Sequence, residues 1–376
     1  MATFLHTADW QIGRQYGQFD DEDAVLLAQA RVDAVSAIAR LAAERQVDAV
    51  LVAGDVFDTQ GVSDRSVRRL FAALAPYAGP WIMIAGNHDA ALADSVWTRA
   101  RALGCVPDNV HVPESTCVVA LDASRIAVLA APLTQRQTHD DVTLAFDSMQ
   151  SPEGWLRVGL AHGSIEGHLP DSVDATNPIA ADRVKRAALD YLALGDWHGM
   201  LSIEPRLWYS GTPEPDRFRS ATAGHVLHVC IDAAGGLPEV TPIKLGRYVW
   251  QQRNAVLALD SDADMLAAEL DALGQHDVLR LVLTGEISVT GWAALEATID
   301  RCAARIHALR LDTAGLAVVP DDDDLAALAA DGYVGQVAAE FNALRDDATL
   351  GTTARAALRI LLQTQRTLAT GSGRAS

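Results

Sequence analysis

Residues 81–89 read Trp-Ile-Met-Ile-Ala-Gly-Asn-His-Asp, an apolar run followed by a glycine and three polar residues. The apolar part, 81–85, has the length and composition of a buried strand. Gly86 lets the chain turn tightly where that strand ends, and ligands of open α/β sheets collect at the carboxyl ends of strands. There Asn87 can offer an oxygen to a metal ion and His88 can transfer a proton. This stretch predicts a strand that delivers reactive side chains to one edge of a sheet.

The same arrangement occurs twice earlier in the chain. Residues 3–8 and 48–53 are apolar runs, and they lead to Asp9 and Asp55 respectively. An alanine- and leucine-rich segment with helical periodicity, 24–45, separates the two runs, and a further helical segment precedes the third. Strands that alternate with helices favour an α/β fold with parallel strands.

Polar residues also follow two later apolar runs, 156–160 and 191–194. Because parallel strands bring their carboxyl ends to one edge, we expect all these side chains to meet there. Carboxylate, imidazole and amide donors suit Mn²⁺, Fe²⁺ or Zn²⁺, and two such ions about 3.5–4 Å apart can hold a phosphoryl group and activate a water. The candidate ligands are Asp9, Gln11, Asp55, Asn87, His162, Asp196 and His198, with Asp55 best placed to bridge two ions.

In order and spacing these motifs resemble the signature of calcineurin-like metallophosphoesterases. The short sequence segments 4–10, 54–59, 161–164 and 209–213 are similar to those of SbcD-type DNA repair nucleases. The resemblance implies a four-layer α-β-β-α sandwich with a small C-terminal α+β capping domain and a helical tail. The motifs that carry it are Asp9-x-Gln11, Gly54-Asp55-x-x-Asp58, Gly86-Asn87-His88-Asp89, His162-Gly163 and Gly195-Asp196-x-His198.

The resemblance also implies a role for each candidate ligand, and two divalent metal ions as cofactors. Asp9 and His198 are expected to bind the first ion, Asn87 and His162 the second, and Asp55 both.

The implied catalytic residues are His88 and Asp89. The resemblance keeps His88 off the metal ions and places it against the scissile phosphate. There it stabilises the transition state or protonates the leaving oxygen. Asp89 is expected to orient the His88 ring.

Two positions depart from the family pattern. Gln11 stands where the family has the histidine of Asp-x-His, and Asp196 stands where it has the first histidine of Gly-His-x-His. Both residues can bind a metal through oxygen, which favours Mn²⁺ over Zn²⁺. With these changes the chain looks like the stand-alone bacterial metallophosphoesterase nucleases. That likeness implies a Mn²⁺-dependent endonuclease that cuts single-stranded DNA in DNA repair.

Four further residues are candidates for substrate binding. Trp10 and Trp197 stand beside predicted ligands, where they either stack a nucleobase or pack in the core. Arg14 either contacts a phosphate or lies on solvated surface. Ser210 lies in a turn-rich loop and either offers a backbone N–H group to a phosphate or closes the turn.

Length and composition suggest more than one domain. A chain of 376 residues exceeds the usual size of one domain, and the candidate ligands cease near Gly246. We therefore expect a catalytic domain at 1–246, a capping domain at 247–319 and a helical segment at 320–376.

The formal net charge of −19 weakens a nucleic-acid hypothesis, because nucleic-acid binders usually present basic surface. Metal ions and a locally basic rim can still hold a phosphate backbone. The four cysteines are widely spaced, which argues against a disulfide framework or a zinc site. With neither a leader peptide nor an apolar run of membrane-spanning length, we expect a cytoplasmic protein that does not bind membranes.

Several functions remain open at this point. The leading one is the single-strand DNA endonuclease. The alternatives are a 3′–5′ exonuclease subunit that works with a coiled-coil ATPase, a phosphatase or cyclic-nucleotide phosphodiesterase, and a scaffold whose metal site is disabled. The predicted partners are single-stranded DNA and a repair ATPase or helicase.

Overall fold

The chain divides into two compact units, Met1–Trp250 and Gln251–Ser376. The predicted boundary after residue 246 lies near the end of the first unit, and the predicted separation of 320–376 from a capping domain stays a prediction. No helix in the described part of the chain is long and apolar enough to cross a membrane. The computed structural model describes all residues except 169–175, 219–221, 320–331, 346 and 373–376.

The first sheet has the strand order β14-β13-β1-β2-β3-β4. Strands β1 to β4 are parallel, whereas β13 runs antiparallel to β1 and β14 runs antiparallel to β13. The strands are β1 Ala2–Thr7, β2 Ala49–Val52, β3 Trp81–Met83, β4 Val110–His111, β13 His225–Ile231 and β14 Glu239–Lys244, and the intervening helices are α1 Asp21–Arg45, α2 Asp64–Ala73 and α3 Val96–Ala102.

The second sheet has the order β11-β12-β10-β7-β6-β5. Its four inner strands are parallel, and antiparallel strands form both edges. Its strands are β5 Cys117–Leu121, β6 Ile126–Ala131, β7 Leu156–His162, β10 Tyr191–Gly195, β11 Leu201–Glu204 and β12 Leu207–Tyr209. Short elements beside it are η1 Leu144–Asp147, β8 Ser164–Ile165, β9 Pro178–Ile179 and α4 Arg183–Arg186.

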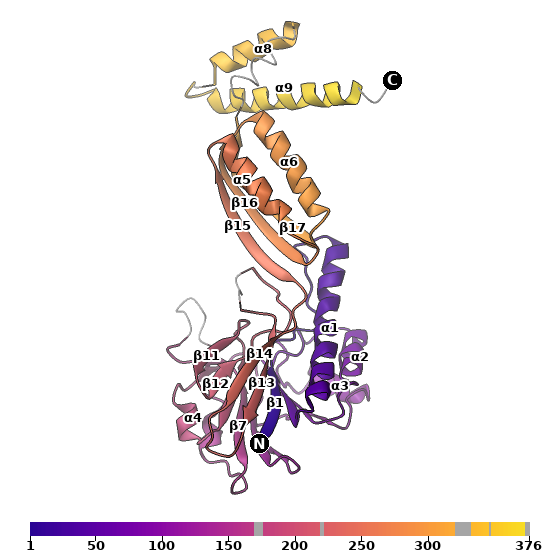
Figure 1. Cartoon of the computed structure of the whole chain (residues 1–376), viewed down its shortest axis with the longest axis vertical. Helices are drawn as coiled ribbons and strands as arrows, with labels where there is room; N and C mark the ends of the chain where they lie inside the picture. The colour runs from indigo at the N-terminus through magenta and orange to yellow at the C-terminus, as the bar shows by residue number, and fades with distance from the viewer. Residues whose placement is uncertain (169–175, 219–221, 320–331, 346, 373–376) are drawn as a thin grey trace. The chain divides into compact units, whose positions relative to one another are not determined.

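Apolar side chains from both sheets form the inner core of this unit, among them Phe4, Leu51, Val128 and Leu160. The outer face of the first sheet packs against α1, α2 and α3 (Figure 1). The outer face of the second sheet packs against η1 and α4. The predicted four-layer α-β-β-α sandwich is therefore confirmed.

One polar side chain crosses the inner core and joins the sheets. His6 of β1 donates from Nε2 to the carbonyl oxygen of Leu194 at 3.1 Å, and Nδ1 accepts from the Tyr191 hydroxyl at 3.0 Å. Burial lowers the pKa of His6 to about 3, so the ring stays neutral. These bonds tie β1 to β10, the two strands that lead to Asp9 and Asp196.

The second unit contains a three-stranded sheet of order β15-β16-β17, in which β16 and β17 are parallel. Helices α5 and α6 pack on it through an apolar core, as the predicted α+β domain requires. Strands β15 and β17 are not predicted from the sequence, because their alternating residues lack a continuous apolar run. The elements are β15 Val249–Leu257, α5 Asp260–Asp271, β16 Asp277–Ile287, α6 Val289–Ala303, β17 Ala308–Val318, α8 Gly332–Ala343 and α9 Gly351–Ser372.

Candidate metal centre

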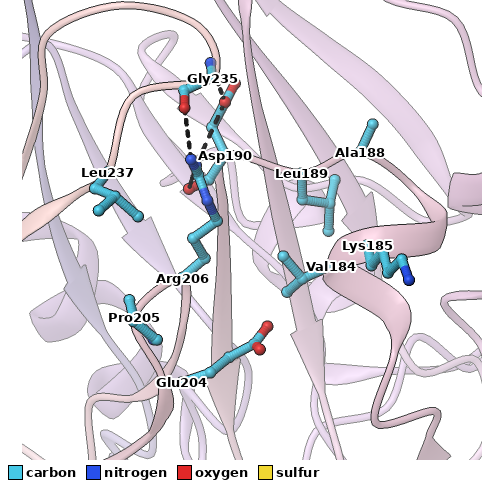
Figure 2. A pocket seen from close by; sticks show the side chains of 10 residues that line it. All are labelled: Val184, Lys185, Ala188, Leu189, Asp190, Glu204, Pro205, Arg206, Gly235 and Leu237. Atoms are coloured by element: carbon cyan, nitrogen blue, oxygen red, sulfur yellow. Dashed lines mark hydrogen bonds and ion pairs between the residues drawn. The ribbon is translucent and has the colours of Figure 1, made fainter.

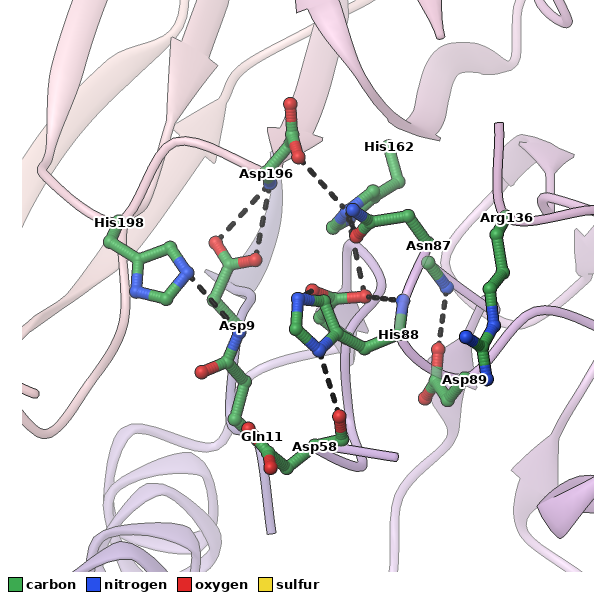
Figure 3. A network of polar contacts seen from close by, with 12 residues as sticks. Asp9, Gln11, Asp58, Asn87, His88, Asp89, Arg136, His162, Asp196 and His198 are labelled. Carbon is green, nitrogen blue, oxygen red and sulfur yellow. Dashed lines mark hydrogen bonds and ion pairs between the residues drawn. The ribbon is translucent and has the colours of Figure 1, made fainter. Parts of the chain in front are cut away.

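Three of the predicted ligands gather where β1, β2 and β7 end. Asp9 follows β1, Asp55 follows β2, and His162 is the last residue of β7. All three are buried, and one ligand atom from each lies within 4.8 Å of the others. Figure 3 shows Asn87 and Asp196 beside this group. The sandwich thus brings together ligands that lie far apart in the sequence.

Asn87 and Asp196 both face the His162 ring. His162 Nε2 lies 3.1 Å from Asn87 Oδ1, 3.6 Å from Asp55 Oδ1 and 3.7 Å from Asp196 Oδ1. The other ring nitrogen, Nδ1, donates to the carbonyl oxygen of Ala53 at 2.8 Å. That bond fixes the ring and leaves Nε2 toward the oxygen donors, which is how metal-binding histidines are commonly held.

Four predicted ligands have a backbone conformation that non-glycine residues rarely adopt. The φ angle is 54° at Asp9, 43° at Gln11, 52° at Asp55 and 99° at Asp196. Such conformations cost of order 1–3 kcal/mol each and persist only where the surroundings enforce them. Backbone bonds from Asp9 N to Gly54 O and from Gln11 N to Asp55 O, 3.1 and 2.8 Å, hold two of these loops against each other. The strain is therefore concentrated at the predicted site.

The motif glycines let the ligands approach one another. A Cβ atom at Gly86 would collide with Oδ1 and the backbone nitrogen of Asp55. A Cβ atom at Gly54, whose φ is 88°, would collide with the His162 ring. Larger residues at either position would separate the donor atoms.

Negative charge exceeds positive charge in this cluster. Burial raises the pKa of Asp9 to about 6, although His198 and His162 lower it. Burial opposes the charged form of His162, but the carboxylates of Asp55, Asp196 and Asp9 raise the pKa of His162 to about 9. Within the described residues, no lysine or arginine forms an ion pair with these three carboxylates. Because buried charges require partners, this donor set fits divalent metal ions.

His198 is oriented by Asp216, a residue that the sequence analysis missed. His198 Nδ1 lies 3.0 Å from Asp216 Oδ2, which is how metal-binding histidines are commonly held, and Arg217 Nη2 lies 2.9 Å from His198 Nε2. Burial opposes the ionised form of Asp216, but His198, Arg31 and Arg217 hold the pKa of its carboxyl well below its usual range. Asp216 follows no apolar strand, so the strand-end pattern gives no signal for it.

Gln11 lies beside His198 but turns its oxygen away from the cluster. Gln11 Nε2 is 3.2 Å from His198 Nε2, and Gln11 Oε1 accepts from Arg14 at 2.5 Å. A half-turn of the amide would exchange its oxygen and nitrogen. Metal binding by Gln11 stays a prediction.

His88 lies beside Asp55 with its ring partly exposed. Its Nδ1 donates to the backbone carbonyl of Asp58 at 2.8 Å, and its Nε2 lies 3.9 Å from Asp55 Oδ2. The side chain is 40% exposed, so a substrate can reach it. The Asp58 carbonyl therefore orients the ring, and proton transfer by His88 stays a prediction.

The predicted orienting role of Asp89 is wrong. Asp89 is fully buried, and its carboxylate accepts three backbone N–H bonds, from Gly86 at 2.7 Å, Val56 at 2.9 Å and Phe57 at 3.1 Å. These bonds join the loops that follow β2 and β3. Burial is the largest cause that raises the pKa of Asp89 to about 7. Asp89 positions the backbone of Asp55 and His88 and does not contact the imidazole.

Arg31, on α1, fastens two loops of the site, and the sequence analysis missed it as well. Its guanidinium is fully enclosed and donates to the carbonyls of Asp9 and Trp10 at 2.9 and 2.6 Å. It also donates to the Thr212 hydroxyl and to the carbonyl of Glu214 at 3.0 and 3.1 Å. A polar residue inside an amphipathic helix resembles surface in the sequence, which hides this role.

Two of the predicted substrate contacts are wrong, because the residues are buried. Trp10 is 1% exposed, donates from Nε1 to Thr7, and packs edge-on against Trp81. Ser210 is fully buried, and its hydroxyl donates to the carbonyl of Gly211. The alternatives of core packing and turn closure describe them.

Trp197 and Arg14 are more accessible. Trp197 is half-buried beside the outer core of the second sheet. Arg14 is 25% exposed and lies 3.4 Å from carboxylate oxygens of both Asp58 and Asp216. Their contacts with a substrate stay predictions.

A pocket of about 490 Å³ lies away from this cluster, where β10 begins, and none of the predicted ligands lines it (Figure 2). There Arg206 donates to the carbonyls of Asp190 and Gly235 at 2.9 and 2.7 Å, and its guanidinium lies 3.6 Å from the Asp190 carboxylate. Arg206 pairs with Asp190, and the lining contains no histidine or cysteine, so the pocket does not resemble the candidate metal centre.

The two stacked sheets and the carboxylate cluster define a metal-dependent phosphoesterase. Residues 2–200 match the calcineurin-like phosphoesterase family, and the chain belongs to that family. It is a metal-dependent hydrolase that acts on phosphodiester bonds.

Two relatives with similar sequences are both SbcD subunits of SbcCD nucleases. The chain is 28% identical over 373 residues to the SbcD subunit of the SbcCD nuclease of Rhodobacter capsulatus, and the match covers 85% of this chain and 90% of that protein. It is 26% identical over 268 residues to the SbcD subunit of the SbcCD nuclease of Bacillus subtilis, covering 62% and 66%. The predicted resemblance to SbcD-type proteins is confirmed.

A solved structure with a partial match is that of TT1561 of Thermus thermophilus. The match covers 64% of this chain and 98% of that one, with a TM-score of 0.39 and 12% identity.

Proposed function

We propose that this protein is a Mn²⁺-dependent phosphodiesterase that cleaves internal bonds of single-stranded DNA. The observation that carries the proposal is the buried cluster of Asp9, Asp55 and His162 with the half-buried Asp196 beside it, whose carboxylates have no lysine or arginine counter-ion among the described residues. Oxygen donors outnumber imidazoles in this set, and that balance favours Mn²⁺ over Zn²⁺.

Each predicted ligand is assigned to one or both of the two metal ions. Asp9 and His198 would hold one ion, Asn87 and His162 would hold the other, and Asp55 would contribute to both. Two bound ions supply charge for the phosphoryl oxygens and lower the pKa of an attacking water.

His88 is the general acid of the proposed reaction. The Asp58 carbonyl accepts a hydrogen bond from the Nδ1–H group of His88. When the His88 ring is protonated, its second proton is therefore on Nε2, which faces the substrate. Its transfer to the leaving oxygen avoids the release of an unstable alkoxide.

The DNA substrate is proposed from the relatives, whose names describe them as nuclease subunits. The net charge of −19 opposes broad, sequence-independent attraction of DNA. Contacts must therefore be few and close to the metal centre, where Arg14, Arg217 and Arg136 lie near the ligands. We therefore expect the rate of DNA cleavage to depend strongly on Mn²⁺ and weakly on salt concentration.

Product mapping on end-labelled linear and on circular single-stranded DNA with Mn²⁺ tests this proposal. We expect the circle to be linearised and the linear strand to give internal fragments. His88→Gln serves as the control for contaminating nucleases. A protein that binds Mn²⁺ but hydrolyses neither DNA nor bis(p-nitrophenyl) phosphate would overturn the proposal, and preference for a phosphomonoester or a cyclic nucleotide would support those alternatives.

A second candidate, an exonuclease subunit that works with a coiled-coil ATPase, is favoured by the relatives' description as subunits. Helices α8 and α9 expose apolar side chains on which a partner helix can pack, including Tyr333 at 80% and Ile360 at 58% exposure. This candidate predicts that linear DNA is degraded from its ends and that the circle stays intact.

A further inference from the structure

A pocket of about 210 Å³ adjoins the candidate metal centre on the side of His88. We propose that it binds the phosphate next to the scissile one, on the leaving-group side, with Arg136 as the counter-ion. This inference rests on the proposed DNA substrate and gives that substrate a direction across the site. The lining residues are Asp58, Thr59, Asn87, His88, Arg136 and Gln137.

Arg136 has a guanidinium that can accept an anion. Its side chain is exposed and forms no hydrogen bond or ion pair with any residue that the structure describes. Figure 3 shows this side chain alongside Asn87. The carboxylate in the pocket lining, Asp58, lies 3.4 Å from the Arg14 guanidinium, so its charge is offset. A phosphate in this pocket therefore meets a free cation.

The loop that carries Arg136 is fixed by a buried asparagine. Asn177 Oδ1 accepts from the Thr138 amide at 2.9 Å, and Asn177 Nδ2 donates to the Arg136 carbonyl at 3.3 Å. The Asn177 carbonyl in turn accepts from the Ser164 amide at 3.0 Å, two residues beyond His162. The backbone at Arg136 is thus tied to the strand end that supplies a metal ligand, and a fixed backbone lowers the entropy lost when a substrate binds.

His88 sets the direction of the substrate. Its Nε2 faces the leaving oxygen in the proposed reaction, and the same residue lines the pocket. The leaving group therefore departs on the side of Arg136. In a DNA strand that group continues to another phosphate, whereas an aryl leaving group carries none. Arg136 should favour polynucleotides over aryl diesters.

The test compares two variants that each remove one positive charge, Arg136→Gln and Arg125→Gln. Arg125 is exposed in the turn before β6, and Arg136 lies beyond the opposite end of the same strand. Both are assayed on a single-stranded 20-mer and on bis(p-nitrophenyl) phosphate at several salt concentrations. Thermal unfolding checks that each variant is folded.

For Arg136→Gln we expect kcat/KM on the oligonucleotide to fall about 10-fold more than on the aryl diester, as the loss of one charge-assisted hydrogen bond implies. The slope of log kcat/KM against log salt should become shallower by about 0.7, the share of one phosphate on a single strand. Arg136→Lys should recover part of both effects, and Arg125→Gln should change neither.

Equal losses on both substrates, or no loss on the oligonucleotide, overturn the assignment of Arg136 while DNA cleavage by the unaltered chain still stands. If the unaltered chain hydrolyses the aryl diester but not DNA, the proposed function itself fails, and the subsite fails with it.

Discussion

The two ends of strand β10 carry carboxylates in opposite electrostatic settings. At its start, Asp190 accepts amide bonds from Gly235 and Arg157 at 2.6 and 2.9 Å and lies 3.6 Å from the Arg206 guanidinium. At its end, Asp196 accepts from the Ser164 hydroxyl at 3.1 Å and has no arginine or lysine partner among the described residues.

The difference separates a structural carboxylate from a functional one. A buried carboxylate that the fold needs for stability is neutralised by the protein itself, as Asp190 is by Arg206. A carboxylate that is left with a surplus of negative charge, in a strained backbone, needs a cation from outside. Position at the carboxyl edge of the sheet and the lack of a lysine or arginine partner among the described residues together mark the candidate metal centre.

The largest effect should come from removing one carboxylate of each kind, Asp55 in the candidate metal centre and Asp190 at the start of β10. Asp55→Asn removes the proposed bridging carboxylate, and we expect Mn²⁺-dependent hydrolysis of bis(p-nitrophenyl) phosphate to fall by about 10³-fold or more. Asp190→Asn should keep activity within about twofold but destabilise the fold by about 2 kcal/mol, because Arg206 loses its charged partner. Rates and urea unfolding measure the two effects, and similar rates for both variants would refute the comparison.

His88→Gln separates proton transfer from metal binding at the same edge of the sheet. We expect kcat to fall by about 10²-fold, the usual share of a general acid, whereas Mn²⁺ binding by calorimetry stays unchanged. Loss of metal binding in this variant would instead make His88 a ligand.

The stabilisation of the protein by Mn²⁺ should depend on the residues at the carboxyl edge of the sheet. At 100 times its dissociation constant, Mn²⁺ should raise the free energy of unfolding by about 2.7 kcal/mol. Asp190→Asn should keep this increment and Asp55→Asn should lose most of it. Thermal unfolding with chelator and with Mn²⁺ gives the comparison, and an equal increment in both variants would mean that the ion binds elsewhere.

The metal-free protein should lose stability as pH rises. In the folded state the pKa of His162 is raised to about 9, above the value of about 6.5 expected after unfolding. Its contribution, up to about 3 kcal/mol, is therefore complete below pH 6.5 and disappears between pH 6.5 and 9. His162→Gln should flatten this slope in chelated protein. An unchanged slope would show that the histidine does not carry the charge of the empty site.

The gathering of the candidate ligands at one edge of the sandwich was predictable because one rule covers them. Asp9, Asp55, Asn87 and His162 each follow an apolar run, and parallel strands place such positions at one edge of a sheet. The sandwich itself follows from the same runs together with the helices between them.

Other parts of the site depend on tertiary contacts that no local pattern contains. Asp216 and Arg31 act through partners distant in the chain, His198 for Asp216 and the Asp9 carbonyl for Arg31. Asp89 was misassigned because its neighbour in sequence, His88, is not its neighbour in hydrogen bonding. For Trp10 the sequence left core packing and base stacking open, because a residue beside a candidate ligand can still point into the core, as Trp10 does.

The central claim is that the carboxyl edge of the sandwich holds two Mn²⁺ ions through Asp55 and its neighbours. Its most direct test is the metal content of the purified full chain after dialysis against Mn²⁺, measured by elemental analysis beside Asp55→Asn and Asp190→Asn. We expect about two ions in the unaltered chain and in Asp190→Asn, and at most one in Asp55→Asn. A folded, unaltered chain that retains no metal would contradict the account.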